Sequence, residues 1–286
     1  MSKARQLADL GNVYDDGALS NRNLIINGAM QVAQRGTSFS AGDGYTLDRF
    51  VCVNHTSASQ SSSCPSGFIN SLEVTGTNVL VRQPIENSHF RLSANSFTVS
   101  FYIKGNAAYS GTVDINDGTQ QSFSITTTWQ RIVKTFDALT SPSAVYGNNN
   151  DYLDIQVSDT SATWQITGVQ LEVGDLSTAT PFEHRSYGDE LARCQRYYST
   201  YEYPNTNARH YGVSDNFGYY QSEVTFPVTM RATPTATQTS APTYDGCDNV
   251  RPQFGGNTGA VFLIDLDGNN KHFYAKDYAY AFDAEL

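Results

Sequence analysis

Tyrosines that alternate with polar side chains are the residues of this chain best suited to recognising a ligand. In the segment FTVSFYIK, Tyr102 and Lys104 share the face opposite Phe101 and Ile103. Aromatic rings can lie against the C–H groups of sugars, while carboxylates, amides and amines hydrogen-bond the sugar hydroxyls. The candidates for glycan binding, all expected to point outward, are Tyr102, Lys104, Asp114, Tyr152, Gln156 and Tyr219. The alternative is that these tyrosines cover neighbouring strands or lie in a subunit interface.

Common catalytic motifs are missing from the sequence. It contains no HExxH, no phosphate-binding GxxxxGK[ST] and no GxSxG. We therefore expect a protein that is not an enzyme. Glycoside hydrolysis needs only two carboxylates at a suitable separation, so a polysaccharide depolymerase stays open as an alternative.

One segment, DLDGNN from Asp265 to Asn270, resembles the start of a calcium-binding loop. Lys276 stands where such a loop carries its bidentate glutamate, so a hairpin turn is favoured over a metal site. The histidines are scattered without metal-ligand spacing. We expect neither a metal nor a cofactor.

Period-two alternation predicts the elements that must position the candidates. Phe97, Val99, Phe101 and Ile103 form one apolar face, and Leu153, Ile155 and Val157 form another. The segment TVDINDGTQQSFSI reads as a hairpin that turns at Asp117-Gly118. With 16% charged residues and many Tyr, Phe, Thr and Ser, the chain is expected to be mainly β, with an antiparallel sandwich.

Tryptophans and cysteines are expected in structural roles. Trp129 and Trp164 are interpreted as core anchors. The four cysteines show no CxxC pair, and free thiols are favoured over a Cys52–Cys64 disulfide.

A single segment, around residue 190, predicts a helix. Ser186 and Asp189 have the spacing of a capping box, and Asp189 and Glu190 would lie in the positive first turn. Leu191, Cys194 and Tyr198 would form a narrow apolar stripe. We interpret the helix as an inter-domain or inter-subunit element, built on Glu190, Leu191, Arg193, Cys194 and Arg196.

The predicted organisation has four parts. They are an N-terminal arm (1–22), a β-sandwich (23–182), a connector helix (183–198) and a smaller C-terminal β domain (199–286). In the arm, KARQLADL places Leu7, Ala8 and Leu10 on one side of a short helix, which needs another surface to cover it. The alternative for the arm is a frayed tail.

Charge limits the expected partners. The chain has 28 acidic and 18 basic residues, for a net charge of −10, which repels phosphate backbones and anionic headgroups. We expect neither nucleic acid binding nor membrane insertion. The N-terminus has no continuous apolar run of the kind a secretion signal needs, so synthesis and folding in a cytoplasm are expected.

Several segments, which follow one another along the chain, resemble receptor-binding fibre proteins of tailed bacteriophages. They are NLIINGAMQVAQRG (23–36), GVQLEVGDLSTATPFEHRSYGDELARCQRYY (168–198), FPVTMRATPT (226–235) and the terminal DAEL. The resemblance implies a virion structural protein, a homotrimeric tail fibre assembled in the host cytoplasm, whose β domains face host surface polysaccharide. It also implies attachment to other virion proteins through the arm, with Arg5, Leu7, Ala8 and Leu10 as candidates, and helix charges that pair across subunits.

The first domain also resembles carbohydrate-binding jelly rolls. NLIINGAMQ is similar to their opening motif, and WQITGVQLEVG to their closing strand. At the positions of their calcium-binding acids this chain has Gln31 and Gly168-Val169, so no calcium ligand carries over. Besides a tail fibre, a capsid decoration or head fibre with a structural role remains an alternative.

Overall fold

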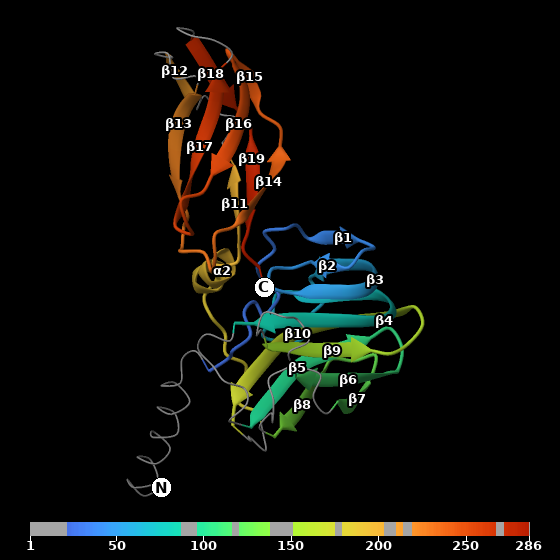
Figure 1. Ribbon diagram of the computed structural model, residues 1–286. Coiled ribbons are helices and arrows are strands. Elements are labelled where there is room, and N and C mark those ends of the chain that lie inside the picture. Colours follow the sequence, from blue (N-terminus) through green and yellow to red (C-terminus); the bar gives the residue numbers. More distant parts are fainter. Residues whose placement is uncertain are drawn as a thin grey trace, which may run out of the picture. The chain divides into compact units, whose positions relative to one another are not determined.

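Antiparallel strands make up most of the described chain, as the alternating segments predict. The protein is described by a computed structural model at residues 22–86, 96–115, 120–137, 151–174, 179–202, 210–213, 219–266 and 272–285 (Figure 1). The chain divides into two units between Ser186 and Tyr187. Both units are built from antiparallel sheets, and the first is a jelly-roll-like, nearly closed sheet. The mainly β fold is confirmed.

The described part of the first unit contains ten strands. They are β1 (Ser38–Ser40), β2 (Gly44–Tyr45), β3 (Val51–Ser61), β4 (Ser71–Ile85), β5 (Phe97–Gly105), β6 (Tyr109–Ile115), β7 (Gln121–Ile125), β8 (Gln130–Phe136), β9 (Asp151–Val157) and β10 (Ala162–Val173). The main path of the sheet runs β7-β6-β9-β4-β10-β5-β8, and β3 joins it beside β4. The β6–β7 pairing confirms the predicted hairpin strands, while the turn residues Asp117-Gly118 lie outside the described residues.

The long strand β4 takes part in two layers because it changes partner along its length. Residues 72–76 pair with β10, whereas residues 79–85 pair with β9. We call β1, β3, β4, β10, β5 and β8 the first sheet, and β2, β3, β4, β9, β6 and β7 the second sheet. β3 and β4 are common to both.

Glycine is required where β3 and β4 turn from one sheet to the other. Asn54 and Asn78 have positive φ values of 61° and 53° at this corner. A Cβ on Gly76 would lie 2.5 Å from the backbone oxygen of Asn54. The two strands therefore approach at this point more closely than any side chain permits.

The core between the two sheets contains the predicted inward residues. Phe97, Val99, Phe101 and Ile103 on β5 are fully buried, and so, to within 2% exposure, are Leu153, Ile155 and Val157 on β9. Trp164 also belongs to this core, as predicted. Burying side chains of this size stabilises a fold by about 1.5–3 kcal/mol each.

The second unit is a smaller β structure that begins with helix α2 (Tyr187–Gln195). Its strands are β11 (Tyr198–Glu202), β12 (His210–Val213), β13 (Tyr219–Thr225), β14 (Thr235–Ser240), β15 (Thr243–Asp245), β16 (Cys247–Gln253), β17 (Gly259–Leu266), β18 (His272–Lys276) and β19 (Ala279–Asp283). They form three-stranded sheets in the orders β11-β19-β14, β12-β18-β15 and β13-β17-β16. Among the described strands, the Thr-rich β14 pairs only with β19.

Aromatic rings form the core of the second unit. Phe262 is fully buried, and its ring centroid lies 5.2 Å from that of Tyr201 and 5.3 Å from that of Tyr280. Phe226 and Phe282 are in contact, with ring centroids 5.0 Å apart. This second core supports the division into two units.

Helix α2 is shorter than the predicted range 183–198. It starts directly after Ser186, in agreement with the predicted cap position, and ends at Gln195. Before the helix, Arg185 donates a hydrogen bond to the backbone oxygen of Ile25, which holds residues 179–185 against the first unit. After it, Tyr198 opens β11 and pairs with Asp283.

The buried side of α2 also differs from the prediction. Glu190 and Cys194 are buried, whereas Leu191, Arg193 and Arg196 are half-buried. The predicted stripe of Leu191, Cys194 and Tyr198 is therefore wrong, because the chain leaves the helix before Tyr198. The role of the helix between domains or subunits stays a prediction.

Candidate functional site

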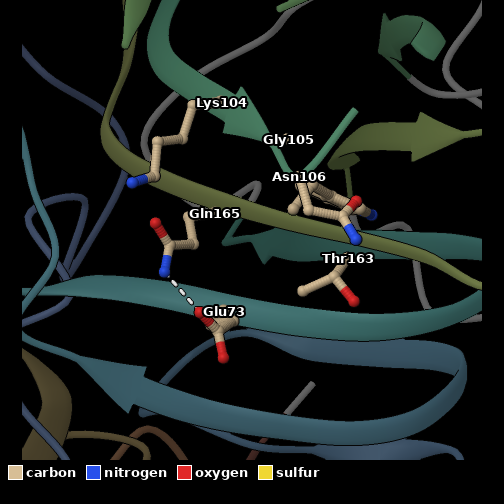
Figure 2. Close-up of a pocket in the computed structure, with 7 residues that line it drawn as sticks. Glu73, Lys104, Gly105, Asn106, Thr163 and Gln165 are labelled. Carbon is tan, nitrogen blue, oxygen red and sulfur yellow. Dashed lines mark hydrogen bonds between the residues drawn. The ribbon is translucent and has the colours of Figure 1, made fainter. Parts of the chain in front are cut away.

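Polar side chains line up across three neighbouring strands on the outer face of the first sheet. Gln165 on β10 is directly opposite Glu73 on β4 and Lys104 on β5. Side chains alternate between the faces of a strand, so all three project away from the core that Trp164 and Ile166 enter. Figure 2 shows the row, with Lys104, Gln165 and Glu73 in sequence across the strands.

The row borders a depression in this face. Its volume is about 180 Å³, which is enough for part of a sugar ring, and it is open to solvent. The lining residues are Glu73, Lys104, Gly105, Asn106, Thr163, Trp164 and Gln165 (Figure 2). Together, the side chains of Glu73, Lys104, Asn106, Thr163 and Gln165 offer both hydrogen-bond donors and acceptors.

Lys104 is held in place at one end of the row. Its Nζ atom donates a hydrogen bond of 2.9 Å to Ser63 Oγ and lies 5.5 Å from the centroid of the Trp129 ring. This distance is within the range of a cation–π contact. Trp129 is half-buried, so its interpretation as a core anchor is wrong, because it precedes β8 in a turn at the rim of the sheet.

Gln165 and Glu73 form the other part of the row. The amide nitrogen of Gln165 donates a short hydrogen bond to the Glu73 carboxylate and a longer one, of 3.3 Å, to Ser61 Oγ. Gln165 is only 7% exposed, and its Oε1 atom has no hydrogen-bond partner among the described residues. A buried acceptor without a donor costs free energy, so this atom suits a ligand hydroxyl.

The other half of the same face is covered by residues 179–185. The Thr180 hydroxyl donates to the Glu172 carboxylate, and Arg131 donates to the Thr180 carbonyl oxygen and, at 3.0 Å, to Ser100 Oγ. Ser100 is fully buried as a result. Among the described residues, this segment does not extend over the half of the face beside Lys104 and Gln165, where the depression lies.

Aromatic rings separate the open half of the face from the covered half. The centroid of the Phe68 ring lies 5.3 Å from that of Tyr102 and 5.1 Å from that of Phe182. Gly168, with φ of 61°, permits this packing, because a Cβ there would lie 2.6 Å from Phe68 Cζ. Tyr102 is thus on the predicted face, but its ring supports Phe68 and is only half-exposed.

Three other candidates lie on the outer face of the second sheet. Tyr152 is 3% exposed and Asp114 is 5% exposed, so the prediction that they point into solvent is wrong. The Tyr152 ring lies 4.1 Å from the Arg82 guanidinium, which pairs with Asp154 beside Asp114. A buried charge network covers this part of the face, and only Gln156 among these three candidates is half-exposed.

The remaining predicted site residues fall elsewhere. Tyr219 begins β13 in the second unit, where the structure describes its backbone pairing with Asp265 but not its side chain. Arg5, Leu7, Ala8 and Leu10 lie outside the described residues. The six glycan-binding candidates are therefore spread over two sheets and two units. Tyr102 and Lys104 share the outer face of the first sheet, and Asp114, Tyr152 and Gln156 share that of the second.

Sequence reasoning missed Glu73, Asn106, Thr163 and Gln165. A signal existed for two of them, because LEV and WQI each place a polar residue between two inward apolar ones. Those patterns predict that Glu73 and Gln165 point outward, but not that they are neighbours. Their proximity follows from the strand register, which no local pattern determines.

No cysteine is among the residues that line the depression. All four cysteines are free, as expected, and burial raises the pKa of the Cys52 thiol to about 12. Asp265, from the segment that resembles a calcium loop, lies on β17 and is paired with Arg251 at 2.9 Å. The described part of the chain holds no cluster of three metal-ligating side chains and no helix long and apolar enough to cross a membrane.

Comparisons with known proteins give structural likenesses only. No protein-family model matches the chain, and no curated protein matches its sequence. The CBM22-1 xylan-binding domain from Paenibacillus barcinonensis Xyn10C is 12% identical over 55% of this chain and 100% of that domain, with a TM-score of 0.36. TmCBM61, solved in complex with β-1,4-galactotriose, is 15% identical over 54% of this chain and 99% of its own, with a TM-score of 0.33.

A bacteriophage protein is also among the similar structures. The enzymatically active domain of bacteriophage CBA120 tailspike protein 4 is 12% identical over 53% of this chain and 21% of that chain, with a TM-score of 0.32. All three TM-scores are below 0.5, so the description of the first unit as a jelly roll rests on its own strand order and register.

Proposed function

We propose that the first unit binds glycans at the open half of the outer face of the first sheet. The observation that carries this proposal is the depression where Lys104, Gln165 and Glu73 converge, with the Trp129 ring against Lys104. Sugars need hydrogen-bond donors and acceptors close together, with an aromatic ring nearby, and this face supplies all three. The sequence resemblance to carbohydrate-binding jelly rolls supports the same ligand class.

We further propose that the protein is a bacteriophage fibre that presents this face to polysaccharide on the host cell. The support is the resemblance of residues 23–36, 168–198 and 226–235 to receptor-binding fibres. Homotrimer formation, assembly in the host cytoplasm and attachment to the virion through residues 1–22 belong to this proposal. Several copies on one particle would compensate for the weak binding of a shallow site.

Binding of the purified full-length protein to an immobilised panel of bacterial surface polysaccharides tests the glycan proposal. Replacing Trp129 with alanine should weaken retention about tenfold, because stacking against a ring and the support of Lys104 are both lost. The control is Gln238→Met in the second unit, which should leave retention unchanged. Retention that is unaffected by Trp129→Ala, or no binding to any polysaccharide, would overturn the proposal.

The virion proposal needs a separate experiment. Antibody labelling of particles in the electron microscope should place the protein on the tail, whereas label on the capsid face would favour a decoration or head fibre. A chain that lacks residues 1–22 should fail to enter particles, and light scattering of the purified protein should give the mass of three chains. Release of reducing sugar ends from a bound polysaccharide would instead favour a depolymerase.

A further inference from the structure

The polar row across β4, β10 and β5 has a fixed order of hydrogen-bonding polarity. Lys104 Nζ can only donate, and the Glu73 carboxylate can only accept. Between them, Gln165 already uses its amide nitrogen on Glu73 and Ser61, while its buried Oε1 atom has no hydrogen-bond donor among the described residues. A ligand at this row therefore meets a donor, then an acceptor without a partner, then a second acceptor.

Only some chemical groups satisfy this order. A hydroxyl can accept from Lys104 and at the same time donate to Gln165 Oε1, because it has both a proton and lone pairs. A carboxylate or phosphate accepts from Lys104 but cannot donate to Gln165, and its charge is repelled by Glu73. An ammonium group is repelled by Lys104 and cannot accept a hydrogen bond from it, because it has no lone pair. The neutral hydroxyl is the one of these groups that serves both neighbours.

The spacing of the row fits more than one hydroxyl. Neighbouring strands are about 4.8 Å apart, so the backbones at Glu73 and Lys104 are separated by about 10 Å. The ends of the two side chains can thus contact two hydroxyls of one sugar ring, the first between Lys104 and Gln165 and the second at Glu73. The depression of about 180 Å³ that the row borders gives the ring its place.

The row is also held in its geometry before any ligand arrives. Lys104 is positioned by Ser63 Oγ at 2.9 Å and by the Trp129 ring, and no ion pair within the described residues joins it to Glu73. Gln165 is 7% exposed and fixed by Glu73. Because these side chains lose little freedom on binding, their polarity can discriminate between ligands.

We propose, on the basis of the glycan-binding function proposed above, that this row selects neutral sugars with two free hydroxyls on one ring over uronic acids and amino sugars. Lys104 and Gln165 are the residues that determine this specificity. The excess of negative charge on the chain does not produce the selection, because it would disfavour acidic sugars everywhere on the surface and would not disfavour amino sugars.

The experiment measures binding of the full-length protein to a soluble glucan and a soluble mannan, each in three forms: native, carboxylated at C6, and treated with mild periodate to cleave adjacent hydroxyl pairs. At least one native form should bind, carboxylation should weaken that binding about tenfold or more, and periodate treatment should abolish it. Because a neutral ligand forms no ion pair, affinity should change less than about twofold between 50 and 500 mM salt.

Two variants connect the selection to the row. Lys104→Met and Gln165→Met should each weaken binding to the native form about tenfold, since each removes one partner of the same hydroxyl. Their matched controls are Lys134→Met and Gln238→Met, which change the same residue types away from the depression. Unchanged far-UV circular dichroism and unfolding transitions would show that the two test variants remain folded.

The possible outcomes separate this proposal from the one on which it rests. If no native or modified glycan binds, and the surface-polysaccharide panel is also negative, both proposals fail. If glycans bind through Trp129 but the carboxylated forms are preferred, or if affinity falls steeply with salt, the glycan-binding function stands and the selection for neutral sugars is wrong. The same conclusion follows if Lys104→Met and Gln165→Met bind as the wild type does.

Discussion

Replacing Gly168 with alanine should destabilise the first unit by about 2–5 kcal/mol. Gly168 has φ of 61°, a conformation that costs residues with a Cβ about 1–2 kcal/mol. The new methyl group would also lie 2.6 Å from Phe68 Cζ and 2.9 Å from Tyr102 Cδ2, well inside the 3.5–4.0 Å at which carbon atoms pack. Relieving such contacts costs about 1–3 kcal/mol more, because the Phe68 ring must move off the sheet.

Urea unfolding followed by tryptophan fluorescence measures this loss in the first unit alone. The chain has two tryptophans, Trp129 and Trp164, and both belong to the first unit. The matched control is Gly67→Ala, since Gly67 also has a positive φ, of 92°, but a Cβ there would meet nothing within 4 Å. That control should cost about 1–2 kcal/mol, from the backbone alone.

The difference in stability between the two variants tests the inferred packing of the Phe68 ring on the sheet. Gly168→Ala should exceed Gly67→Ala by about 1–3 kcal/mol, and it should also weaken glycan binding, because Phe68 then no longer separates the two halves of the face. If the two substitutions cost the same within about 0.5 kcal/mol, the close packing of Phe68 on the sheet would not contribute to stability. The inferred role of the Phe68 ring in separating the two halves of the face would then be wrong.

Three further substitutions test other parts of the structure. Phe262→Ala should cost about 3–5 kcal/mol in the second unit, lowering a calorimetric transition without moving the tryptophan transition. Arg82→Ala should cost the first unit about 3–5 kcal/mol, measured by urea unfolding, because the buried Asp154 loses its ion-pair partner. Burial raises the pKa of Cys52 from 9.0 to about 12 and keeps the thiol protonated in the folded state, while the Thr46 hydrogen bond partly opposes the shift. The free energy of unfolding should therefore be unaffected by this group below pH 9 and should fall by up to about 4 kcal/mol as the pH rises to 12. Cys52→Ala should remove this contribution to the pH dependence.

Local sequence patterns correctly predicted buried core residues of the first unit. Alternation identified the buried face of β5 and of β9, because a residue that enters a core must be apolar whatever strand lies beside it. Composition and turn residues also predicted antiparallel strands, because β-favouring residue types and hairpin turns are local features. The cap at Ser186 was also correct, since a helix start depends on a few adjacent residues.

The end of the helix and the position of Trp129 could not be predicted in the same way. Tyr198 leaves the helical spacing because it pairs with Asp283, a residue far away in the sequence. Trp129 lies at the rim of the sheet because Lys104, from another strand, packs against its ring. In both cases a tertiary contact overrides a local preference, and nothing in the adjacent sequence indicates the partner.

The candidate site shows the same limit at a finer scale. Alternation divides inward from outward residues, but a sandwich has two outer faces, and Tyr152 and Tyr102 are outward on different ones. One outer position can also be buried by another part of the chain, as Glu172, at 2% exposure, is by Thr180. A binding face is thus defined by the register between strands and by the segments that leave it open. Glu73, Gln165 and Lys104 can act on one ligand because β10 pairs with β4 on one side and with β5 on the other, and a shift of one residue in either pairing would turn one of them into the core.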